Sequence, residues 1–175
     1  MSPVNKNRIS SQEASALAER YLDLYGNAMF RFAYSFMKNR EDAEDVVQDA
    51  LIKAISSGAV FENEAHEKTY LFQIIKNRCL DLIKKRDRHP VRPFEETMGT
   101  EEIGTEEKSD LSFVLEAVGK LPANERAAVH LFYAEGLSTA EIAKVTGRKE
   151  STVRSDLLRG RKRLKAILKE EYDFE

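Results

Sequence analysis

The sequence predicts an all-α protein of two small helical domains joined by a flexible acidic linker. Three observations support this prediction. Apolar residues recur at three- and four-residue steps along most of the chain, and no strand-type alternation persists. A stretch with glycine, proline and many glutamates interrupts the helical period near the middle. Basic residues gather in the last third of the chain, although the net charge is only −2.

The bulk properties exclude several classes of protein. Of the 175 residues, 42% are hydrophobic, which is enough for a packed core, and no apolar run approaches the length of a membrane span. The polar start of the chain, residues 1–12, does not resemble a signal peptide. We therefore expect a cytoplasmic protein. The only cysteine, Cys79, permits no internal disulfide, and we expect it to lie in the core.

The first domain is expected over residues 10–90 and should contain three helices. The first helix has an apolar face made by Leu17, Tyr21, Leu24, Ala28, Phe32 and Phe36. The segment Asn39–Asp42 can cap the second helix, and Ser57 and Gly58 can end it. A polar loop follows. The third helix then shows an apolar face from Tyr70 to Ile83.

The linker is expected over residues 91–109, and the second domain over residues 110–170. The linker has no apolar period and contains Pro93, Gly99 and Gly104 among its glutamates. Helical periodicity resumes at Leu111. The second domain should therefore be a separate group of short helices.

The segment from Gly136 to Leu168 predicts a helix-turn-helix. Ser138 and Glu141 have the spacing of a capping box, which satisfies the free amides at a helix start. Gly147 permits a left-handed turn after a short helix, and a longer, basic helix follows. Two helices joined in this way commonly place the second one in the major groove of DNA.

The outward residues near the start of that second helix are candidates for contacts with duplex DNA. Arginine can pair with the acceptors of guanine, and serine or threonine can hold phosphates. The candidates are Ser151, Thr152, Arg154, Ser155, Leu158 and Arg159. An ordinary helical hairpin with a basic surface is the alternative interpretation.

Two segments of the first domain carry weaker signals. Asp45, Gln48 and Asp49 fall on the polar side of the second helix, and by themselves they indicate only a solvated face. From Thr69 to Asp81, aromatic and basic residues alternate. Aromatic rings can stack on unpaired bases while cations hold the backbone, but these rings could equally belong to the core.

Taken together, the three segments resemble the extracytoplasmic-function (ECF) sigma factors of the sigma-70 superfamily, over roughly Tyr21 to Leu168. The resemblance implies a factor that binds core RNA polymerase and directs it to promoters. It implies that Asp45, Gln48 and Asp49 dock on the β′ clamp. It also implies that the second domain reads the minus-thirty-five element and sits on the β flap. It implies an anti-sigma factor as a further partner.

The resemblance assigns the minus-ten element of the promoter to the third helix and the loop before it. There, a flipped base enters a pocket formed by about residues 58–68, and Asn77 helps to close it. The residues implied in minus-ten contacts are Phe61, Tyr70, Lys76, Asn77 and Arg78. Two positions depart from the family pattern. Tyr70 replaces a common tryptophan, and Asp156 stands where a basic residue is frequent, so it should either repel phosphate or accept from a cytosine amine.

Function is therefore expected to be binding rather than catalysis. No nucleophile lies beside a base, His66, His89 and His130 have no ligand spacing, and we expect no metal, cofactor or small-molecule substrate. The main alternative is a homodimeric helix-turn-helix regulator that binds an operator without polymerase. A helical enzyme with an accessory DNA-binding domain is a third possibility, and no candidate active site supports it.

Overall fold

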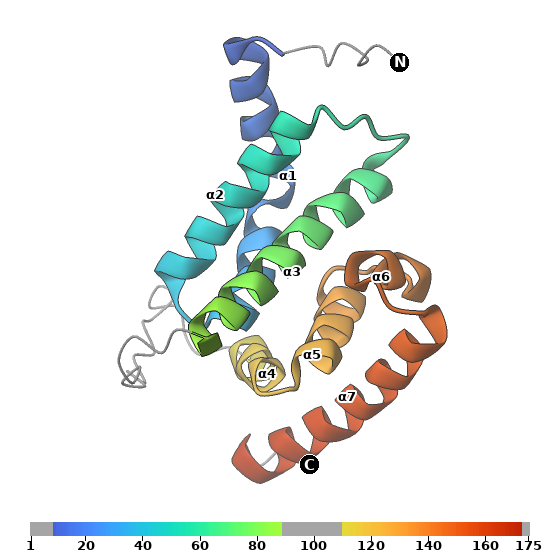
Figure 1. The fold of residues 1–175 in the computed structure, drawn as a ribbon. Coiled ribbons are helices and arrows are strands. Elements are labelled where there is room, and N and C mark those ends of the chain that lie inside the picture. The colour runs from blue at the N-terminus through green and yellow to red at the C-terminus, as the bar shows by residue number, and fades with distance from the viewer. Residues whose placement is uncertain (1–8, 89–109, 173–175) are drawn as a thin grey trace.

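The computed structural model describes residues 9–88 and 110–172, and these residues form helices and no strand. The first domain consists of α1 (Ser11–Met37), α2 (Arg40–Ser57) and α3 (Glu64–Arg88). The second domain consists of α4 (Asp110–Gly119), α5 (Ala123–Val129), the π-helix η1 (His130–Ala134), α6 (Thr139–Thr146) and α7 (Glu150–Tyr172). Figure 1 shows the two groups, so the all-α prediction is confirmed. The predicted linker, residues 91–109, lies outside the described residues.

Local capping signals set several helix ends where the sequence predicts them. The Asn39 side chain accepts a hydrogen bond from the backbone N–H of Asp42 at 2.8 Å and starts α2. Gly58 ends α2 in the left-handed conformation, at φ 61°. The predicted capping box of Ser138 and Glu141 is present at the start of α6. Gly147, at φ 67°, turns the chain from α6 toward α7.

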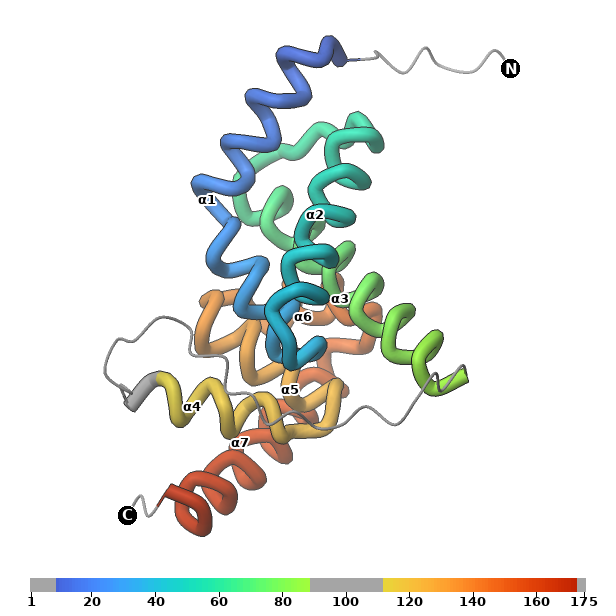
Figure 2. Tube along the Cα trace, turned by 90° about the vertical axis from the view of Figure 1, so that its left-hand side faces the viewer, coloured from blue at the N-terminus to red at the C-terminus, as the bar shows by residue number. Residues whose placement is uncertain are grey.

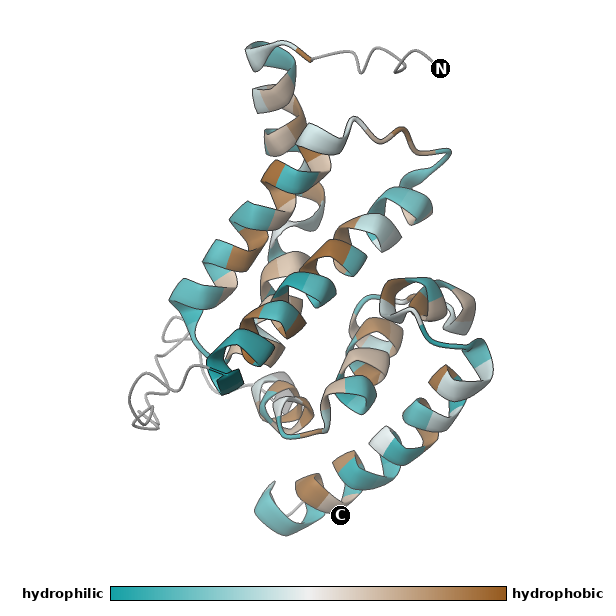
Figure 3. Cartoon of the chain, viewed as in Figure 1, coloured by the Kyte–Doolittle hydropathy of each residue, from teal (hydrophilic) through white to brown (hydrophobic). Residues whose placement is uncertain are grey.

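The core of the first domain lies between the facing sides of α1, α2 and α3, where Figure 3 shows brown residues. Phe32 of α1 packs against Phe72 of α3, with ring centroids 5.2 Å apart. Cys79 is buried in this core as expected, and burial raises the pKa of its thiol to about 12. One predicted core residue is wrong: Leu24 is 52% exposed, because Tyr25 and Met29 take the inward positions on that part of α1.

A glycine lets α7 cross close to α5 in the second domain. A Cβ atom on Gly160 would lie 2.7 Å from the Cγ2 of Val129, well inside van der Waals contact. Gly160 is buried in the middle of α7, and no larger side chain fits there without a shift of the helices. This crossing fixes how the exposed side of α7 is presented.

The two domains pack against each other. In Figures 1 and 2, α6 lies beside α3, and α4 and α5 lie at the lower end of α1. One hydrophobic cluster runs through both domains. Within the described residues, no helix combines the length and the apolarity that crossing a bilayer requires. The domain contact was not predicted from the sequence, and it determines which candidate residues are accessible.

Candidate nucleic-acid interface

Two aromatic side chains predicted for the minus-ten element lie together. The ring centroids of Phe61, in the loop before α3, and Tyr70, on α3, are 5.2 Å apart. Both side chains are half-buried, and they line a shallow hollow of about 420 Å³. Its lining is Phe61, His66, Thr69, Tyr70, Gln73 and Lys144. A hollow edged by two flat rings offers stacking surfaces for an unpaired base.

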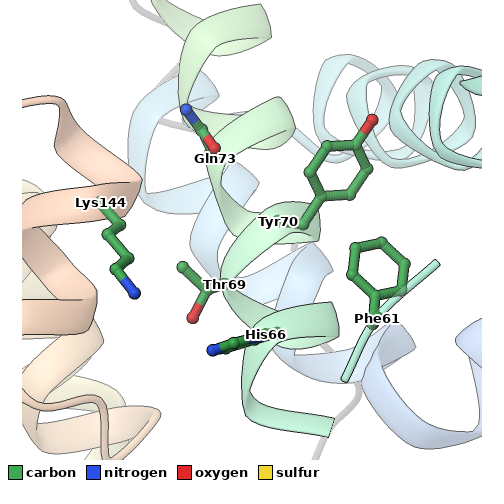
Figure 4. Close-up of a pocket in the computed structure, with 6 residues that line it drawn as sticks. All are labelled: Phe61, His66, Thr69, Tyr70, Gln73 and Lys144. Carbon is green, nitrogen blue, oxygen red and sulfur yellow. The ribbon is translucent and has the colours of Figure 1, made fainter. Parts of the chain in front are cut away.

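Figure 4 shows how this hollow is built from both domains. Tyr70 and Phe61 lie on one side of α3, whereas Lys144 reaches toward α3 from α6. Lys144 was not predicted as a site residue. No sequence signal indicates its position, because it depends on how the two domains pack.

A buried carboxylate anchors the start of α3 against α1. Glu67 accepts a hydrogen bond from the Tyr25 hydroxyl at 3.0 Å and another from the Arg20 guanidinium at 2.8 Å. Burial, with the hydrogen bond to Glu67, raises the pKa of Tyr25 to about 12, so this hydroxyl stays protonated and donating at neutral pH. The anchor lies one helical turn before Tyr70 and therefore fixes the helix that carries the hollow.

The polar residues of the predicted minus-ten element have different surroundings. The Nζ of Lys76 donates to the backbone oxygen of Thr146 in the second domain at 3.0 Å. Burial, together with the nearby Lys84 and Arg148, lowers the pKa of Lys76. Asn77 is exposed on α3. The structure thus leaves Asn77 accessible, while the ammonium of Lys76 bonds a carbonyl group of the second domain.

Arg78 joins two predicted surfaces. Its Nε lies 2.8 Å from the Oδ2 of Asp49, which the family resemblance assigned to polymerase docking. Asp45 and Gln48 are exposed on the same side of α2, and Asp49 is half-buried beside them. Ile52, one turn further along α2, is 64% exposed although it is a large apolar residue. Ile52 was not predicted as a site residue, because its spacing from Val46 and Val47 does not separate it clearly from the core face.

The candidate duplex-contact residues lie where they were predicted on α7. Five of them, Ser151, Arg154, Ser155, Leu158 and Arg159, are exposed, and Thr152 is half-buried. Arg154 pairs with Glu150 one turn earlier, with its Nη2 2.9 Å from the Oε1 of that carboxylate. The exposed side of α7 therefore carries hydroxyl and guanidinium groups that suit phosphates and base edges.

Asp156 does not have the position that the sequence analysis expected. Only 2% of the residue is exposed, and its carboxylate points into the second domain. Its Oδ2 lies 3.0 Å from the Nε of Arg148, and its Oδ1 lies 2.7 Å from the Nη2 of Arg159. The expectation that Asp156 would repel phosphate or accept from a cytosine amine is therefore wrong. Its charge is buried and paired.

Glu125 of α5 also pairs with arginines of α7. This buried residue of α5 has its Oε2 3.0 Å from the Nε of Arg163, and its Oε1 3.6 Å from the Nε of Arg159. Buried carboxylates on α5 and α7 thus hold the arginines that project from α7. Glu125 was not predicted as a site residue, because the spacing of residues in α5 does not indicate which residues of α7 lie across from it.

Comparisons with known proteins match both domains in order. Residues 21–89 match the family Sigma-70 region 2, and residues 114–164 match the family Sigma-70, region 4. The ECF RNA polymerase sigma factor SigM of Mycobacterium tuberculosis is 31% identical over 140 residues, which cover 80% of this chain and 71% of that protein. The RNA polymerase sigma factor SigV of Bacillus subtilis is 29% identical over 160 residues, which cover 91% and 96%.

Two solved structures have similar folds. The sigma factor RpoE from Bartonella quintana, in complex with the anti-sigma factor NepR, matches with a TM-score of 0.71 at 30% identity, covering 87% of this chain and 97% of that one. CnrH, in complex with the cytosolic domain of CnrY, matches with a TM-score of 0.65 at 26% identity, covering 92% and 95%. Both alignments extend over the two helical domains.

Proposed function

We propose how this chain acts at a promoter from one premise: it belongs to the extracytoplasmic-function RNA polymerase sigma factors, which direct the polymerase to promoters. It is a regulatory DNA-binding protein, and we propose that it acts by binding alone, in the cytoplasm, while the polymerase makes the RNA. One observation carries the proposal. A single chain contains an aromatic hollow suited to unpaired bases and an exposed basic helix suited to duplex DNA.

The first domain, about residues 10–90, is proposed to melt and read the minus-ten element. Phe61 and Tyr70 would stack on an unpaired base, and the exposed amide of Asn77 would bond a base edge. Lys76 and Arg78 would hold the strand's phosphates. Tyrosine provides a flat ring, as tryptophan does, and the contact between Tyr70 and Phe61 supports a stacking role.

The second domain, about residues 110–170, is proposed to bind the minus-thirty-five element with its helix-turn-helix. The start of α7 would enter the major groove, as in other proteins of this architecture. Arg154 and Arg159 would make base or phosphate contacts. Ser151, Thr152 and Ser155 would hold phosphates, and Leu158 would contact a thymine methyl. The linker, residues 91–109, would connect the two domains on the polymerase.

The outer side of α2 is proposed to dock on the β′ clamp of core RNA polymerase. Asp45 and Gln48 are exposed and are not needed for the core, so their charge and hydrogen bonds are available to a partner. Asp49 adds a carboxylate beside them. The exposed Ile52 supports the assignment, because interfaces combine polar groups with an apolar contact.

The β flap of polymerase is proposed to dock in a groove of the second domain. This groove, of about 660 Å³, lies between α4, the α5–η1 segment and α7. Val114, Val118 and Leu164 are among its apolar residues, and Arg161, Lys165 and Lys169 add basic groups. A groove of this kind fits an apolar helix face with acidic neighbours. An anti-sigma factor is proposed to inhibit this chain by competing for the same surfaces.

Reconstituted transcription tests the proposed function. The chain would be added to core RNA polymerase on genomic promoter fragments, and we expect run-off transcripts that neither component yields alone. A homodimeric regulator would instead bind its operator tightly without polymerase. If core polymerase starts at the same sites with and without the chain, the proposed function is wrong.

A further inference from the structure

The hollow beside α3 carries a free amide as well as aromatic rings. Gln73 lines it together with Phe61 and Tyr70, and this glutamine is exposed. Figure 4 shows the Gln73 amide on α3, beyond Tyr70 along the helix. Among the residues that the structure describes, none forms a hydrogen bond with this amide. Its donor and its acceptor are therefore both available to a ligand in the hollow.

The two rings leave no room for a base between them. The ring centroids of Phe61 and Tyr70 are 5.2 Å apart, and the ring planes are tilted by 48°. A base sandwiched between two rings needs parallel planes about 7 Å apart, twice the spacing of about 3.4 Å along a stacked strand. Because the rings contact each other, an unpaired base has to stack on the outer face of one of them.

Gln73 is well placed to reach a base that lies on Tyr70. Side chains three residues apart are neighbours on a helix surface, with Cβ atoms about 5–6 Å apart. Asn77, which the family resemblance assigns to base contacts, follows Tyr70 by seven residues, or about 10 Å along the helix axis. It does not line the hollow, and its side chain is one methylene shorter. A base on Tyr70 therefore meets Gln73 and not Asn77.

Thr69 contributes a second polar group to the hollow. Its hydroxyl donates to the backbone oxygen of Ala65 at 2.7 Å, so the hydroxyl oxygen is left to accept a further hydrogen bond. Thr69 and Gln73 are four residues apart and lie next to each other on the helix surface. The hollow thus combines a fixed acceptor with an amide that both donates and accepts.

The backbone that carries Gln73 is held by the core. Phe72 and Ile74, on either side of it, are buried, and Phe72 packs against Phe32 of α1. The amide therefore projects from a rigid helix, as a group that recognises a ligand should. A substitution at exposed Gln73 removes no core contact, so the contact with a base can be changed without unfolding the chain.

We propose that Gln73 reads the unpaired base that stacks on Tyr70, and that Gln73 and Asn77 read different positions of the melted strand. The inference rests on the proposed function of the hollow in the minus-ten element. Stacking on an aromatic ring tolerates every base, since each has a flat face. Bonds from one amide to a donor and an acceptor of a base edge distinguish one base from another. Tyr70 holds the base, and Gln73 identifies it.

Gln73→Glu keeps the shape of the side chain and replaces the amide donor with a second acceptor. A carboxylate only accepts hydrogen bonds, so it favours a base edge with two adjacent donors. Guanine presents such an edge through its N1–H and N2–H groups when it is unpaired. Gln73→Leu removes both polar groups at a similar volume. Gln12→Glu is the matched control, because it makes the same change at an exposed position of α1 outside the proposed surfaces.

Promoter templates with a premelted minus-ten element would report the base preference. The chain would be bound to core RNA polymerase, and the templates would come from promoters that give run-off transcripts. The four bases would be placed in turn at each unpaired position, and competition binding would measure their relative affinities. Ratios between bases cancel the general repulsion between an added carboxylate and the phosphates.

We expect Gln73→Glu to raise the preference for guanine about tenfold at one position, within the range of a bidentate contact. Gln73→Leu should lose discrimination at the same position. Tyr70→Ala should lower the affinity for all four bases there, because the stacking surface is lost. Asn77→Ala should relax the preference at a different position. Gln12→Glu should reproduce the parent at every position.

Two results would overturn the inference while transcription by the parent chain stays intact. One is a set of base preferences that neither Gln73 variant changes at any position. The other is that the Gln73 and Asn77 variants alter the same position. A parent chain that gives no promoter-dependent transcript with core polymerase would instead overturn the proposed function, and this inference with it.

Discussion

One buried carboxylate of α7 holds two arginines in place. Asp156 lies on the inner side of this helix and bonds both Arg148 and Arg159, so neither arginine moves freely in solution. Fixed side chains lose less conformational entropy when they bind than mobile ones do. An acidic residue that looked unfavourable in a helix proposed to read DNA therefore supports the basic groups around it.

Arg159→Ala should weaken recognition of the upstream element by roughly 1–3 kcal/mol if the guanidinium makes a bidentate contact with a base. A phosphate contact would instead give a uniform loss across promoter sequences and a shallower dependence on salt. Binding of the polymerase complex to promoter variants would separate the two cases. Because Arg159 also pairs with buried Asp156, circular dichroism should first establish that the variant folds. Unchanged affinity and salt dependence would remove Arg159 from the DNA surface.

Asn77→Ala should reduce promoter melting and relax the preference at one minus-ten position. The amide is exposed and makes hydrogen bonds as both donor and acceptor, which suits the edge of an unpaired base. Flipping a base costs a few kcal/mol, and the pocket must return that energy. Permanganate footprinting on matched and mismatched promoters would measure the effect, with core binding as the unchanged control. Equal melting of both promoters by variant and parent would show that Asn77 is only a surface residue.

At the scale of single elements, local signals predicted the helices well. Asn39, Gly58, Ser138 and Gly147 act on backbone groups a few residues away, so the sequence alone indicates their role. Leu24 was misplaced because a helical face of three- and four-residue steps tolerates a shift of one position. Asp156 was misread for a different reason, since its partner Arg148 lies in the turn between α6 and α7, outside the helix that carries Asp156.

Replacing Asp45 and Gln48 on α2 with alanine should weaken binding to core polymerase and leave the fold intact. Both side chains are exposed, and the opposite side of the helix already supplies the core with Val46, Val47 and Ala50. Affinity should fall because interface charge and hydrogen bonds are lost. Thermal melting and a core-binding assay measure the two effects. An unfolded double variant, or one that binds core normally, would contradict the assignment of this surface.

Gly160→Ala should destabilise the chain although alanine favours helices. The new methyl group would lie 2.7 Å from the Cγ2 of buried Val129, and such overpacking typically costs about 1–3 kcal/mol. Gly26→Ala is the matched control, because a Cβ there meets only Leu22 at ordinary distances of 3.6 Å and beyond. The control should gain up to about 1 kcal/mol from helix propensity. Urea unfolding would measure the free energy of unfolding of both variants and of the parent. Equal stabilities of the two variants would argue against a tight crossing of α5 and α7.

At the scale of the whole molecule, the arrangement of the domains was beyond sequence reasoning. Lys68 donates to the backbone oxygen of Glu135 over 67 positions, and Lys76 donates to that of Thr146 over 70 positions. No periodicity or capping signal specifies such pairs. The accessibility of the candidate residues in the packed chain therefore could not be predicted from the sequence.

The free chain should bind promoter duplex weakly, and core polymerase should strengthen this binding strongly. Each domain offers one small DNA surface, and holding both at fixed spacing makes the second contact effectively intramolecular, a gain of about 10²–10⁴. Gel shifts with and without core polymerase would measure the difference. Tight, sequence-specific binding by the chain alone would favour the homodimeric regulator.

The π-helix η1 gives the chain a place to change its length by one residue. A π-turn holds one residue more than the α-turn it replaces, and such turns are common at functional sites. Because a π-turn advances fewer degrees per residue than an α-turn, deleting the exposed Tyr133 would return η1 to an ordinary α-helix and leave the chain on either side pointing nearly as before. The same deletion within α5 would instead rotate everything beyond it by roughly 100° around the helix axis.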